Sequence, residues 1–345
     1  MIRPLVPVSV AFANYNGREL LEEFLDSLRA QDYPIAQIIM VDDGSTDGSV
    51  EFVQREYPEV TVIPMGYNSG NVNKVWNRGI QEAHTRYVLS MDNDMTLAPD
   101  ALGKLVEGLL TLPDAVITTP RVLDYENREV ISQEAHRVHF VGFGVQGDRD
   151  KHISQATNVP DRGRVGCGQQ LLDREAIAPF GFYDEGLAFG INDMELPWRM
   201  NLAGLASYQI PDAHFFNRQV RKQPRYLGQV LNRWIFIFQL FALRTLVLTL
   251  PAILSFELLL AVYIGLKGGW DVYPKAVYQL VKQAPRLWMR RREIQATRKV
   301  SDRDLLCAEE LLIPLSINAG FLLRTGVRMV NRGLNLYWNL VRTQL

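Results

Sequence analysis

Short apolar runs alternate with segments of helical periodicity through the first hundred residues. The runs predict strands at Val6–Ala13, Gln37–Asp42, Val60–Met65 and Tyr87–Met91. The segments between them predict helices at Arg18–Ala30, Gly48–Tyr57 and Val72–Ala83, each entered through Gly, Asn, Asp or Ser residues. Alternating strands and helices are typical of βαβ units, so we expect an α/β fold with a doubly wound, mostly parallel sheet.

The pattern is less regular after this sheet. A helix and a strand are expected between residues 99 and 115, and irregular ribbons and loops between 130 and 165. Order returns with a strand at Gln169–Asp173, a helix at Asp193–Ala203 and a strand at Ala206–Ile210. A polar, basic link follows at 212–224.

The segment Trp234–Leu266 is strongly apolar and carries only Arg244 and Glu257 as charged residues. Pro251 would divide it into pieces of about seventeen and fifteen residues, each shorter than the ~20 residues that span a bilayer. We therefore expect a hairpin that dips into a membrane, or an interfacial pair of helices. A soluble helical subdomain with one buried helix is the alternative.

Charge is distributed unevenly along the 345 residues. The whole chain has 37 basic and 38 acidic residues, or −1, which does not indicate a nucleic-acid partner. Residues 221–345 hold 19 basic and 7 acidic residues, or +12, which leaves −13 for residues 1–220. We expect two domains, 1–220 and 221–345. The second would be a basic and apolar helical region that binds an anionic membrane surface, and each basic residue near that surface would contribute roughly 1 kcal/mol to binding.

Two clusters of carboxylates follow predicted strands. Asp42 and Asp43 end the second strand, at the edge where parallel sheets bind ligands, and a carboxylate there can accept hydrogen bonds from a nucleotide base or ribose. Asp92 and Asp94 end the fourth strand, and two close carboxylates can hold Mg²⁺ or Mn²⁺ against a diphosphate. Each cluster alone is also a common turn or helix cap.

A third acidic pair, Asp193 and Glu195, begins a predicted helix. The helix dipole favours acids at this position, so capping is one interpretation. The other is that one of the two carboxylates is the general base that deprotonates an acceptor hydroxyl.

In this order the clusters resemble the family 2 glycosyltransferases, which have the GT-A nucleotide-diphospho-sugar transferase fold, over roughly residues 5–220. The resemblance to a rhamnosyltransferase-like branch is favoured over processive synthases because no Gln-Xaa-Xaa-Arg-Trp segment follows the base. The segments that carry it are Val8–Gly17, Val41–Asp47, Asn68–Gly70, Trp76–Ile80, Asp92–Asp94, Gly166–Gly168, Arg174–Glu175, Gly181–Glu185 and Asn192–Asp193.

The resemblance implies a role for each matching residue. The donor nucleotide would be bound by Ala13, Asn14, Asn16, Asp42, Asp43, Gly70, Asn77, Asp92 and Asn93. Asp193 would be the catalytic base. Mg²⁺ or Mn²⁺ would be held by Asp92, Asp94 and His214. The acceptor would be bound by Gly166, Cys167, Gly168, Asn192 and Glu195.

The chain departs from the family pattern at two positions. Asn192 stands where the family usually has Glu, although the following Asp193 is kept. His214 comes directly after Pro211-Asp212-Ala213, whereas the family more often has its metal-side histidine where this chain has Asn217. A packing or capping role for His214 is therefore an open alternative.

The resemblance implies an inverting enzyme, a hexosyl- or deoxyhexosyltransferase. It would move a sugar from a UDP-, dTDP- or GDP-linked donor to a hydroxyl of a glycan or polyprenyl-linked acceptor in cell-surface polysaccharide synthesis. We expect it at the cytoplasmic face of the cell membrane, peripheral or shallowly inserted. A catalytically silent membrane scaffold and a nucleotidyltransferase are the rival hypotheses, and the poor match of Asn14–Arg18 to a phosphate-binding loop disfavours the second.

Overall fold

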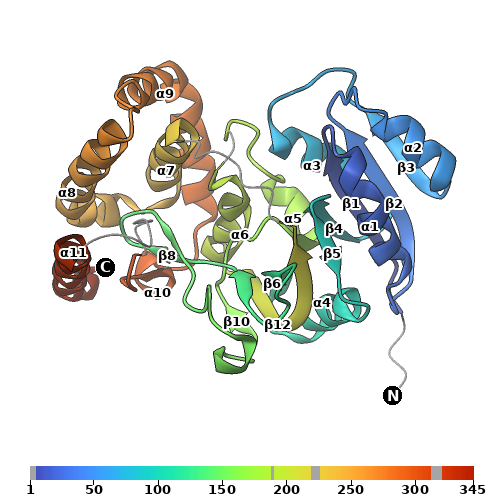
Figure 1. The fold of residues 1–345 in the computed structure, drawn as a ribbon. Coiled ribbons are helices and arrows are strands. Elements are labelled where there is room, and N and C mark those ends of the chain that lie inside the picture. Colours follow the sequence, from blue (N-terminus) through green and yellow to red (C-terminus); the bar gives the residue numbers. More distant parts are fainter. Residues whose placement is uncertain (1–4, 188–189, 219–225, 312–320) are drawn as a thin grey trace. The chain divides into compact units, whose positions relative to one another are not determined.

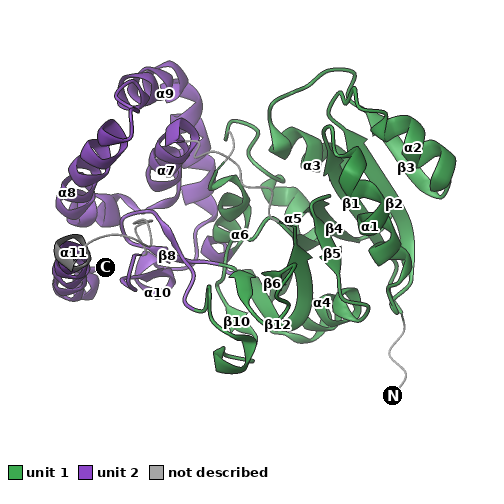
Figure 2. Ribbon diagram, viewed as in Figure 1, with its two compact units in different colours: residues 1–135, 148–200, 205–223 green, residues 136–147, 201–204, 224–345 purple. Residues whose placement is uncertain are grey.

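The structure is a computed structural model that describes residues 5–187, 190–218, 226–311 and 321–345 (Figure 1). The chain forms two compact units (Figure 2). The first comprises residues 1–135, 148–200 and 205–223, and the second comprises 136–147, 201–204 and 224–345. The expected boundary after residue 220 lies in a segment outside the described residues, and two short segments that we assigned to the first domain belong to the second unit.

Ten described strands of the first unit make one mixed sheet. In chain order they are β1 (Val8–Asn14), β2 (Ile35–Asp42), β3 (Val60–Pro64), β4 (Tyr87–Asp92), β5 (Met95–Leu97), β6 (Ala115–Asp124), β7 (Ile131–Gln133), β10 (Asp161–Arg162), β11 (Gln170–Asp173) and β12 (Ala206–Asn217). The helices that accompany them are α1 (Arg18–Arg29), α2 (Ser49–Glu56), α3 (Val72–Glu82), α4 (Ala101–Thr111), α5 (Arg174–Ile177) and α6 (Asn192–Leu202), with short 3₁₀ turns η1 (Ile153–Gln155) and η2 (Ala178–Phe180).

The sheet order is β10-β12-β6-β11-β4-β1-β2-β3, with β5 beside β12 and β7 beside β6. The four strands β3, β2, β1 and β4 are parallel, as the sequence predicts. β11 is antiparallel to both β4 and β6 and joins this half to a parallel pair, β6 and β12. The fold is therefore α/β, with a parallel half that carries the first three βα connections.

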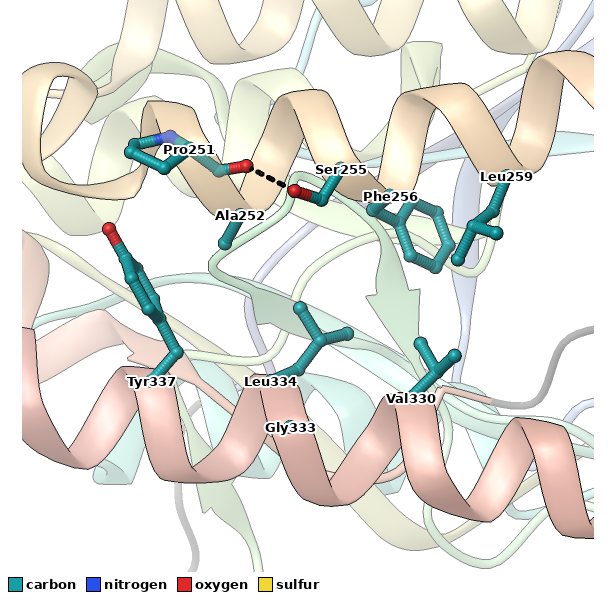
Figure 3. Close-up of a pocket in the computed structure, with 9 residues that line it drawn as sticks. All are labelled: Pro251, Ala252, Ser255, Phe256, Leu259, Val330, Gly333, Leu334 and Tyr337. Carbon is teal, nitrogen blue, oxygen red and sulfur yellow. Dashed lines mark hydrogen bonds between the residues drawn. The ribbon is translucent and has the colours of Figure 1, made fainter.

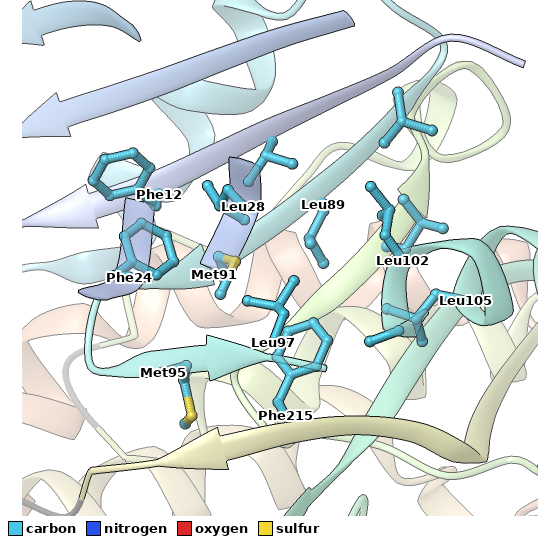
Figure 4. Close-up of a cluster of buried hydrophobic side chains, with 14 of the residues drawn as sticks. Phe12, Phe24, Leu28, Leu89, Met91, Met95, Leu97, Leu102, Leu105 and Phe215 are labelled. Carbon is cyan, nitrogen blue, oxygen red and sulfur yellow. The ribbon is translucent and has the colours of Figure 1, made fainter. Parts of the chain in front are cut away.

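Both faces of the sheet are buried because neighbouring residues on each strand enter different cores. Val10 and Phe12 of β1 join Met40 and Leu89 in a core beneath α1, α2 and α4 (Figure 4). Ala11 of β1 joins a second core with residues from α3, α5 and α6. This alternation explains why the central strands read as continuous apolar runs.

The second unit is mainly helical. Its helices are α7 (Tyr226–Leu240), α8 (Leu243–Leu266), α9 (Val272–Thr297), α10 (Asp302–Leu305) and α11 (Phe321–Val341), followed by η3 (Arg342–Gln344). A small sheet in the order β13-β8-β9 accompanies them, formed by β8 (Arg137–His139), β9 (Gly144–Val145) and β13 (Leu306–Cys307). The fully buried Arg233 of α7 pairs with Glu257 of α8, and Tyr273 of α9 donates a hydrogen bond to the same carboxylate at 2.7 Å.

The expected break at Pro251 was wrong. α8 runs without interruption through Pro251 and contains 24 residues, and the chain turns earlier, between Leu240 and Leu243. Proline removes one intrahelical hydrogen bond, and this helix continues past that loss. α8 is long and apolar enough to cross a membrane by length and composition.

Candidate active site

The ends of three neighbouring strands form one row, which we call the donor edge. In the register of the sheet, Asn14 of β1 lies opposite Asp42 of β2, and Ala13 lies opposite Asp92 of β4. Parallel strands end at the same edge, so residues far apart in the chain are brought together here.

Asp42 and Asn14 lock the first loop of the donor edge. Both side chains are buried, and Asn14 Nδ2 donates to Asp42 Oδ1 at 2.8 Å. The Asp42 carboxylate also accepts from the backbone N–H of Ser45 at 2.9 Å and from its hydroxyl. Three of its roughly four acceptor positions are thus used within the protein, which leaves about one for a ligand.

Two other predicted donor residues shape the same loops. Asn16 has φ 49° and accepts a hydrogen bond from the backbone N–H of Thr46 at 2.8 Å. Asp43 accepts from the backbone N–H of Ser69 at 2.9 Å, which ties the loop after β2 to the loop before α3. Gly70, on that second loop, has φ +61° and open space where a side chain would begin.

Asn93 closes the row from the β4 side. Its Nδ2 donates to Asn14 Oδ1 at 2.7 Å. This contact requires Gly17, because a Cβ at that position would clash with the Asn93 amide and lie 2.7 Å from Asn14 Oδ1. Gly17 is therefore a site residue whose role was not evident from the sequence.

Asp92 is the last residue of β4, Asp94 lies two residues later, and both are partly buried. Asn217 pairs with Met95, next to Asp94, and its buried Oδ1 accepts no hydrogen bond from the residues the structure describes. Two carboxylates and an amide oxygen are hard oxygen ligands of the kind that Mg²⁺ and Mn²⁺ prefer. The residues at this position therefore fit a divalent cation.

His214 does not join this pair. Its backbone carbonyl accepts a hydrogen bond from the N–H of Ala98. His214 lies three positions before Asn217 on β12, and Ala98 lies four residues after Asp94. Burial, with the charges of Lys104 and Arg121, lowers the pKa of His214. Within the described ranges no group of three His, Cys, Asp or Glu side chains is placed to hold a metal. A metal role for His214 stays a prediction, beside the alternative of a packing or capping role.

The amide at the start of α6 has an internal role. Asn192 is buried, its Nδ2 donates to Asn73 Oδ1 at 2.9 Å, and its Oδ1 accepts from the backbone N–H of Gly190 at 2.8 Å. A side chain that both donates and accepts suits this position better than the Glu that is usual in the family. The predicted acceptor-binding role does not fit this arrangement.

Glu195 is also committed within the protein. It is fully buried and pairs with Arg199, one turn later on α6, at 2.8 Å. Arg199 in turn donates to the backbone carbonyls of Phe180, Gly181 and Phe182 at 2.5–2.8 Å. The pair anchors the loop before α6, so the prediction that Glu195 contacts an acceptor was wrong. Sequence periodicity alone does not separate it from Asp193.

Asp193 is partly exposed, and its backbone carbonyl accepts a hydrogen bond that positions the residue. Gln170 of β11 donates to the Asp193 carbonyl at 2.8 Å, and Gln170 Oε1 accepts from the Tyr183 hydroxyl at 3.0 Å. Burial, together with the charges of Asp193 and Asp92, raises the pKa of Tyr183. The Gln170 side chain therefore connects the Tyr183 hydroxyl with the backbone of the predicted base.

Residues 166–168 have an unusual backbone conformation. Gly166, Cys167 and Gly168 all have φ between 76° and 87°, which is unusual for the non-glycine residue. The Cys167 thiol is buried, and burial together with the Asp193 charge raises its pKa. A buried, protonated thiol is a packing group, so any acceptor contact here falls to the two glycines and the backbone.

Asn77 was predicted to bind the donor, and its amide uses both N–H donors and one of its two acceptor positions within the protein. Its Nδ2 donates to the Tyr183 carbonyl and to Glu185 Oε1, and its Oδ1 accepts from the Tyr183 backbone N–H, all at 2.9–3.0 Å. Asn73, one turn earlier on α3, donates to the Asp184 carbonyl at 2.8 Å. The two amides position the loop before α6, and polar residues on the buried face of α3 were the signal for this role.

The comparisons with known proteins agree with this geometry. The Glycosyl transferase family 2 model matches residues 9–167. The poly-beta-1,6-N-acetyl-D-glucosamine synthase of Staphylococcus epidermidis is 23% identical over 228 residues, 65% of this chain and 50% of that protein. The synthase of the same name from Staphylococcus aureus is 24% identical over 201 residues, 57% of this chain and 46% of that protein. The chain thus spans about half the length of these curated relatives.

A solved structure supports the fold. The crystal structure of GalNAc-T7 with UDP, GalNAc and Mn²⁺ superposes with a TM-score of 0.55 at 17% identity, covering 69% of this chain and 50% of that one. The two synthases named above are not rhamnosyltransferases by name, and the expected branch stays a prediction. The first unit of this chain has the GT-A fold, and residues 9–167 within it match the model of glycosyl transferase family 2.

Proposed function

We propose that the chain is an inverting glycosyltransferase that acts in cell-surface polysaccharide synthesis. The observation that carries the proposal is the register of the sheet, which aligns Asn14, Asp42 and Asp92 at one edge. The Gln170 side chain links the Tyr183 hydroxyl to the backbone carbonyl of Asp193 at the head of α6. A nucleoside diphosphate sugar fits the donor edge, and an acceptor hydroxyl fits the side of Asp193.

The proposed reaction is a single displacement. The acceptor oxygen forms a bond to the anomeric carbon while the bond from that carbon to the diphosphate oxygen breaks, so the configuration inverts. Asp193 accepts the proton of the attacking hydroxyl, a contribution of roughly 10²–10⁴ in rate. Asp92 and Asp94, with Asn217, would hold Mg²⁺ or Mn²⁺, which would neutralise the departing diphosphate.

The donor sugar and base are the finer part of the proposal. The curated relatives are named for a polymer of N-acetyl-D-glucosamine, and the solved structure contains UDP. A UDP-linked N-acetylhexosamine is therefore the first donor to test, beside the hexosyl and deoxyhexosyl donors linked to UDP, dTDP or GDP that we expected from the sequence.

The acceptor is proposed to be a glycan or a polyprenyl-linked sugar reached at a membrane. The support is α8, which is long and apolar enough to cross a membrane, and the excess of 12 positive charges in residues 221–345. We place the protein at the cytoplasmic, anionic face of the membrane, where basic residues next to an apolar helix bind most favourably.

A thermal-shift experiment on the purified full-length chain tests the donor site. UDP-, dTDP- and GDP-sugars are added with and without Mn²⁺ or Mg²⁺ to the wild type, to Asp94→Asn, and to Asp212→Asn as a control at an exposed acid of β12. A ligand at a hundredfold excess over its Kd adds about 2.7 kcal/mol to apparent stability. One donor should stabilise the wild type and the control with metal, and Asp94→Asn should lose the metal dependence.

Transfer assays separate the rival functions. A glycosyltransferase releases a nucleoside diphosphate from the sugar donor, whereas a nucleotidyltransferase releases pyrophosphate from a nucleoside triphosphate. If no nucleotide sugar shifts the unfolding temperature and none is consumed, the proposal fails in favour of a silent scaffold.

A further inference from the structure

The backbone carbonyl of Asp193 lies at a point of α6 where the helix lacks the usual donor. In an α-helix a carbonyl accepts a hydrogen bond from the N–H of the residue four positions later, which for Asp193 is residue 197. That residue is Pro197, inside α6, and proline has no backbone N–H. A proline ring also crowds the carbonyl four residues before it. The carbonyl of Asp193 is therefore left to accept a hydrogen bond from outside the helix.

Gln170 supplies that hydrogen bond from the sheet. It is a fully buried residue of β11, and its Nε2 donates to the Asp193 carbonyl at 2.8 Å. A carbonyl only accepts, so the Gln170 amide must turn its N–H side toward α6. The Tyr183 hydroxyl fixes this orientation, because it donates to Gln170 Oε1 at 3.0 Å.

Tyr183 is itself held at its backbone and at its ring. Asn77 Nδ2 donates to the Tyr183 carbonyl at 2.9 Å, and Asn77 Oδ1 accepts from the Tyr183 N–H at 3.0 Å. The Trp76 ring packs on the Tyr183 ring, with the two centroids 5.0 Å apart. The hydroxyl that orients Gln170 thus has a fixed place between α3 and the sheet.

The strand that carries Gln170 also connects this hydrogen bond to the donor edge. In the register of the sheet, Gln170 lies opposite Ser90 of β4, two residues before Asp92. The carbonyl of Asp193 is therefore tied to the neighbour of the strand that ends in the predicted diphosphate site.

A second proline inside a helix, Pro251 of α8, has a different local arrangement. In the close-up of the pocket between α8 and α11, the hydrogen bond drawn beside it runs from the Ser255 hydroxyl to the Pro251 carbonyl at 2.8 Å (Figure 3). That bond stays within the helix. At Pro197 the bond to the carbonyl four residues earlier comes instead from a strand, so it can fix the helix relative to the sheet.

We propose that Gln170 is a positioning residue for the general base Asp193. By making the hydrogen bond that Pro197 cannot make, it sets the direction in which the first turn of α6 presents the Asp193 carboxylate to an acceptor hydroxyl. This inference rests on the proposed function, in which Asp193 is the base. A catalytic group misplaced by about 1 Å can cost roughly 10²-fold in rate.

Replacing Gln170 by Met tests the proposal, because it keeps the length of the side chain and removes its N–H. In the full-length chain, kcat is measured as the release of UDP from UDP-N-acetylglucosamine to an N-acetylglucosamine oligomer. We expect kcat to fall at least tenfold and the Kd for the nucleotide sugar to stay within twofold, because the bond removed belongs to α6 and not to the donor edge. Tyr183→Phe, which removes only the hydroxyl, should lower kcat in the same way by a smaller factor.

Gln37 offers a matched control. It is a residue of β2 whose Nε2 also donates to a helix carbonyl, that of Glu82 in α3, at 3.4 Å. Gln37→Met therefore removes the same kind of contact between a strand and a helix, and kcat per folded molecule should not change. An equal loss of kcat in Gln37→Met and Gln170→Met would overturn the proposal.

Pro197→Ala separates positioning from simple hydrogen-bond satisfaction. When it is combined with Gln170→Met, the N–H of residue 197 can bond the Asp193 carbonyl within the helix. We expect the unfolding temperature to recover toward that of the wild type while kcat stays low. If kcat recovers together with the unfolding temperature, Gln170 only satisfies a carbonyl and the proposal is wrong.

A double-variant cycle shows whether Gln170 acts through the Asp193 carboxylate. Gln170→Met should cause no more than a twofold further loss of kcat in the Asp193→Asn background, because a positioning effect needs the group that is positioned. A loss as large as in the wild-type background would contradict this. Wild-type kcat in Asp193→Asn would overturn the proposed base and this inference with it, whereas wild-type kcat in Gln170→Met alone overturns only the inference.

Discussion

The donor edge and the head of α6 present acidic residues in different ways. At the donor edge, Asp42 and Asp43 shape loops through hydrogen bonds from backbone N–H groups and from short side chains, and acceptor capacity remains. At the head of α6, two acids separated by one residue differ in burial. Asp193 is partly exposed, whereas Glu195 is buried in an ion pair with Arg199. The motif identifies the acidic residues, but their burial indicates which one is available for catalysis and which one stabilises the fold.

The difference shows how an acid can be spared for catalysis. A helix start attracts acids through its dipole, so two acids there could both be capping residues. In this chain Arg199 donates hydrogen bonds to the Glu195 carboxylate and to three backbone carbonyls. Gln170 donates to the backbone carbonyl of Asp193, and the Asp193 carboxylate takes no part in that contact. The comparison predicts that removing the two carboxylates has separable consequences.

Replacing Asp193 by Asn should have the largest effect. We expect kcat to fall by roughly 10²–10⁴, the contribution of a general base, with donor binding and the unfolding temperature unchanged. Steady-state transfer assays and thermal unfolding measure the two quantities. Glu175→Gln, which removes an exposed acid from the first turn of α5, is the control. Wild-type kcat in Asp193→Asn would remove this residue from the mechanism.

Replacing Glu195 by Ala should act on stability instead. The change leaves the Arg199 charge buried without its carboxylate, and breaking a buried ion pair costs about 3–5 kcal/mol. Urea unfolding monitored by tryptophan fluorescence measures this loss, and activity per folded molecule should stay within a few fold. A large drop in kcat at undiminished stability would instead place Glu195 at the substrate.

At the donor edge, Gly17→Ala should weaken both donor binding and stability. The added methyl group displaces Asn93 from Asn14, and overpacking of this kind costs about 1–3 kcal/mol. We expect the Kd for the nucleotide sugar to rise about tenfold, which corresponds to 1.4 kcal/mol. Titration calorimetry measures the Kd. Gly147→Ala, at a position where a Cβ meets open space, should change neither quantity.

The smallest effect is expected from Asn192→Asp, which keeps the size of the side chain but removes its N–H donor. Asn73 Oδ1 then loses its partner, at a cost of about 1–3 kcal/mol in the free energy of unfolding. The KM for the acceptor should not change once folded protein is counted. A tenfold rise in that KM with normal stability would restore Asn192 as an acceptor-binding residue.

The parallel half of the sheet was predictable because its strands are buried on both faces. Expected and observed limits of the first four strands differ by at most two residues. The strand after α6 was predicted to stop at Ile210, before Pro211, yet β12 continues to Asn217. Its pairing with β6 is irregular between Ile210 and His214, and a proline is tolerated in a strand at such an interruption.

The site was predictable where side chains lie at strand ends and not where they depend on long-range partners. Asp42 and Asp92 follow apolar runs, so their place at the sheet edge follows from the pattern alone. The roles of Asn77 and Glu195 are set by the loop at 180–185 and by Arg199, contacts that no local periodicity encodes. Sequence patterns specify elements, whereas a buried polar network specifies which residues are left for a ligand.

The position of β11 has a consequence for the order in which the first unit assembles. All four of its residues pair with β4 on one side, and Leu171 and Leu172 pair with β6 on the other. No direct pairing joins β4 to β6 in the described sheet. During synthesis, the segment from β1 to β4 is complete about 80 residues before β11 appears. Such non-local pairing slows folding and exposes a strand edge meanwhile. The β4 edge therefore stays unpaired until β11 is synthesised, and β12 is added to the other side of β6 after that.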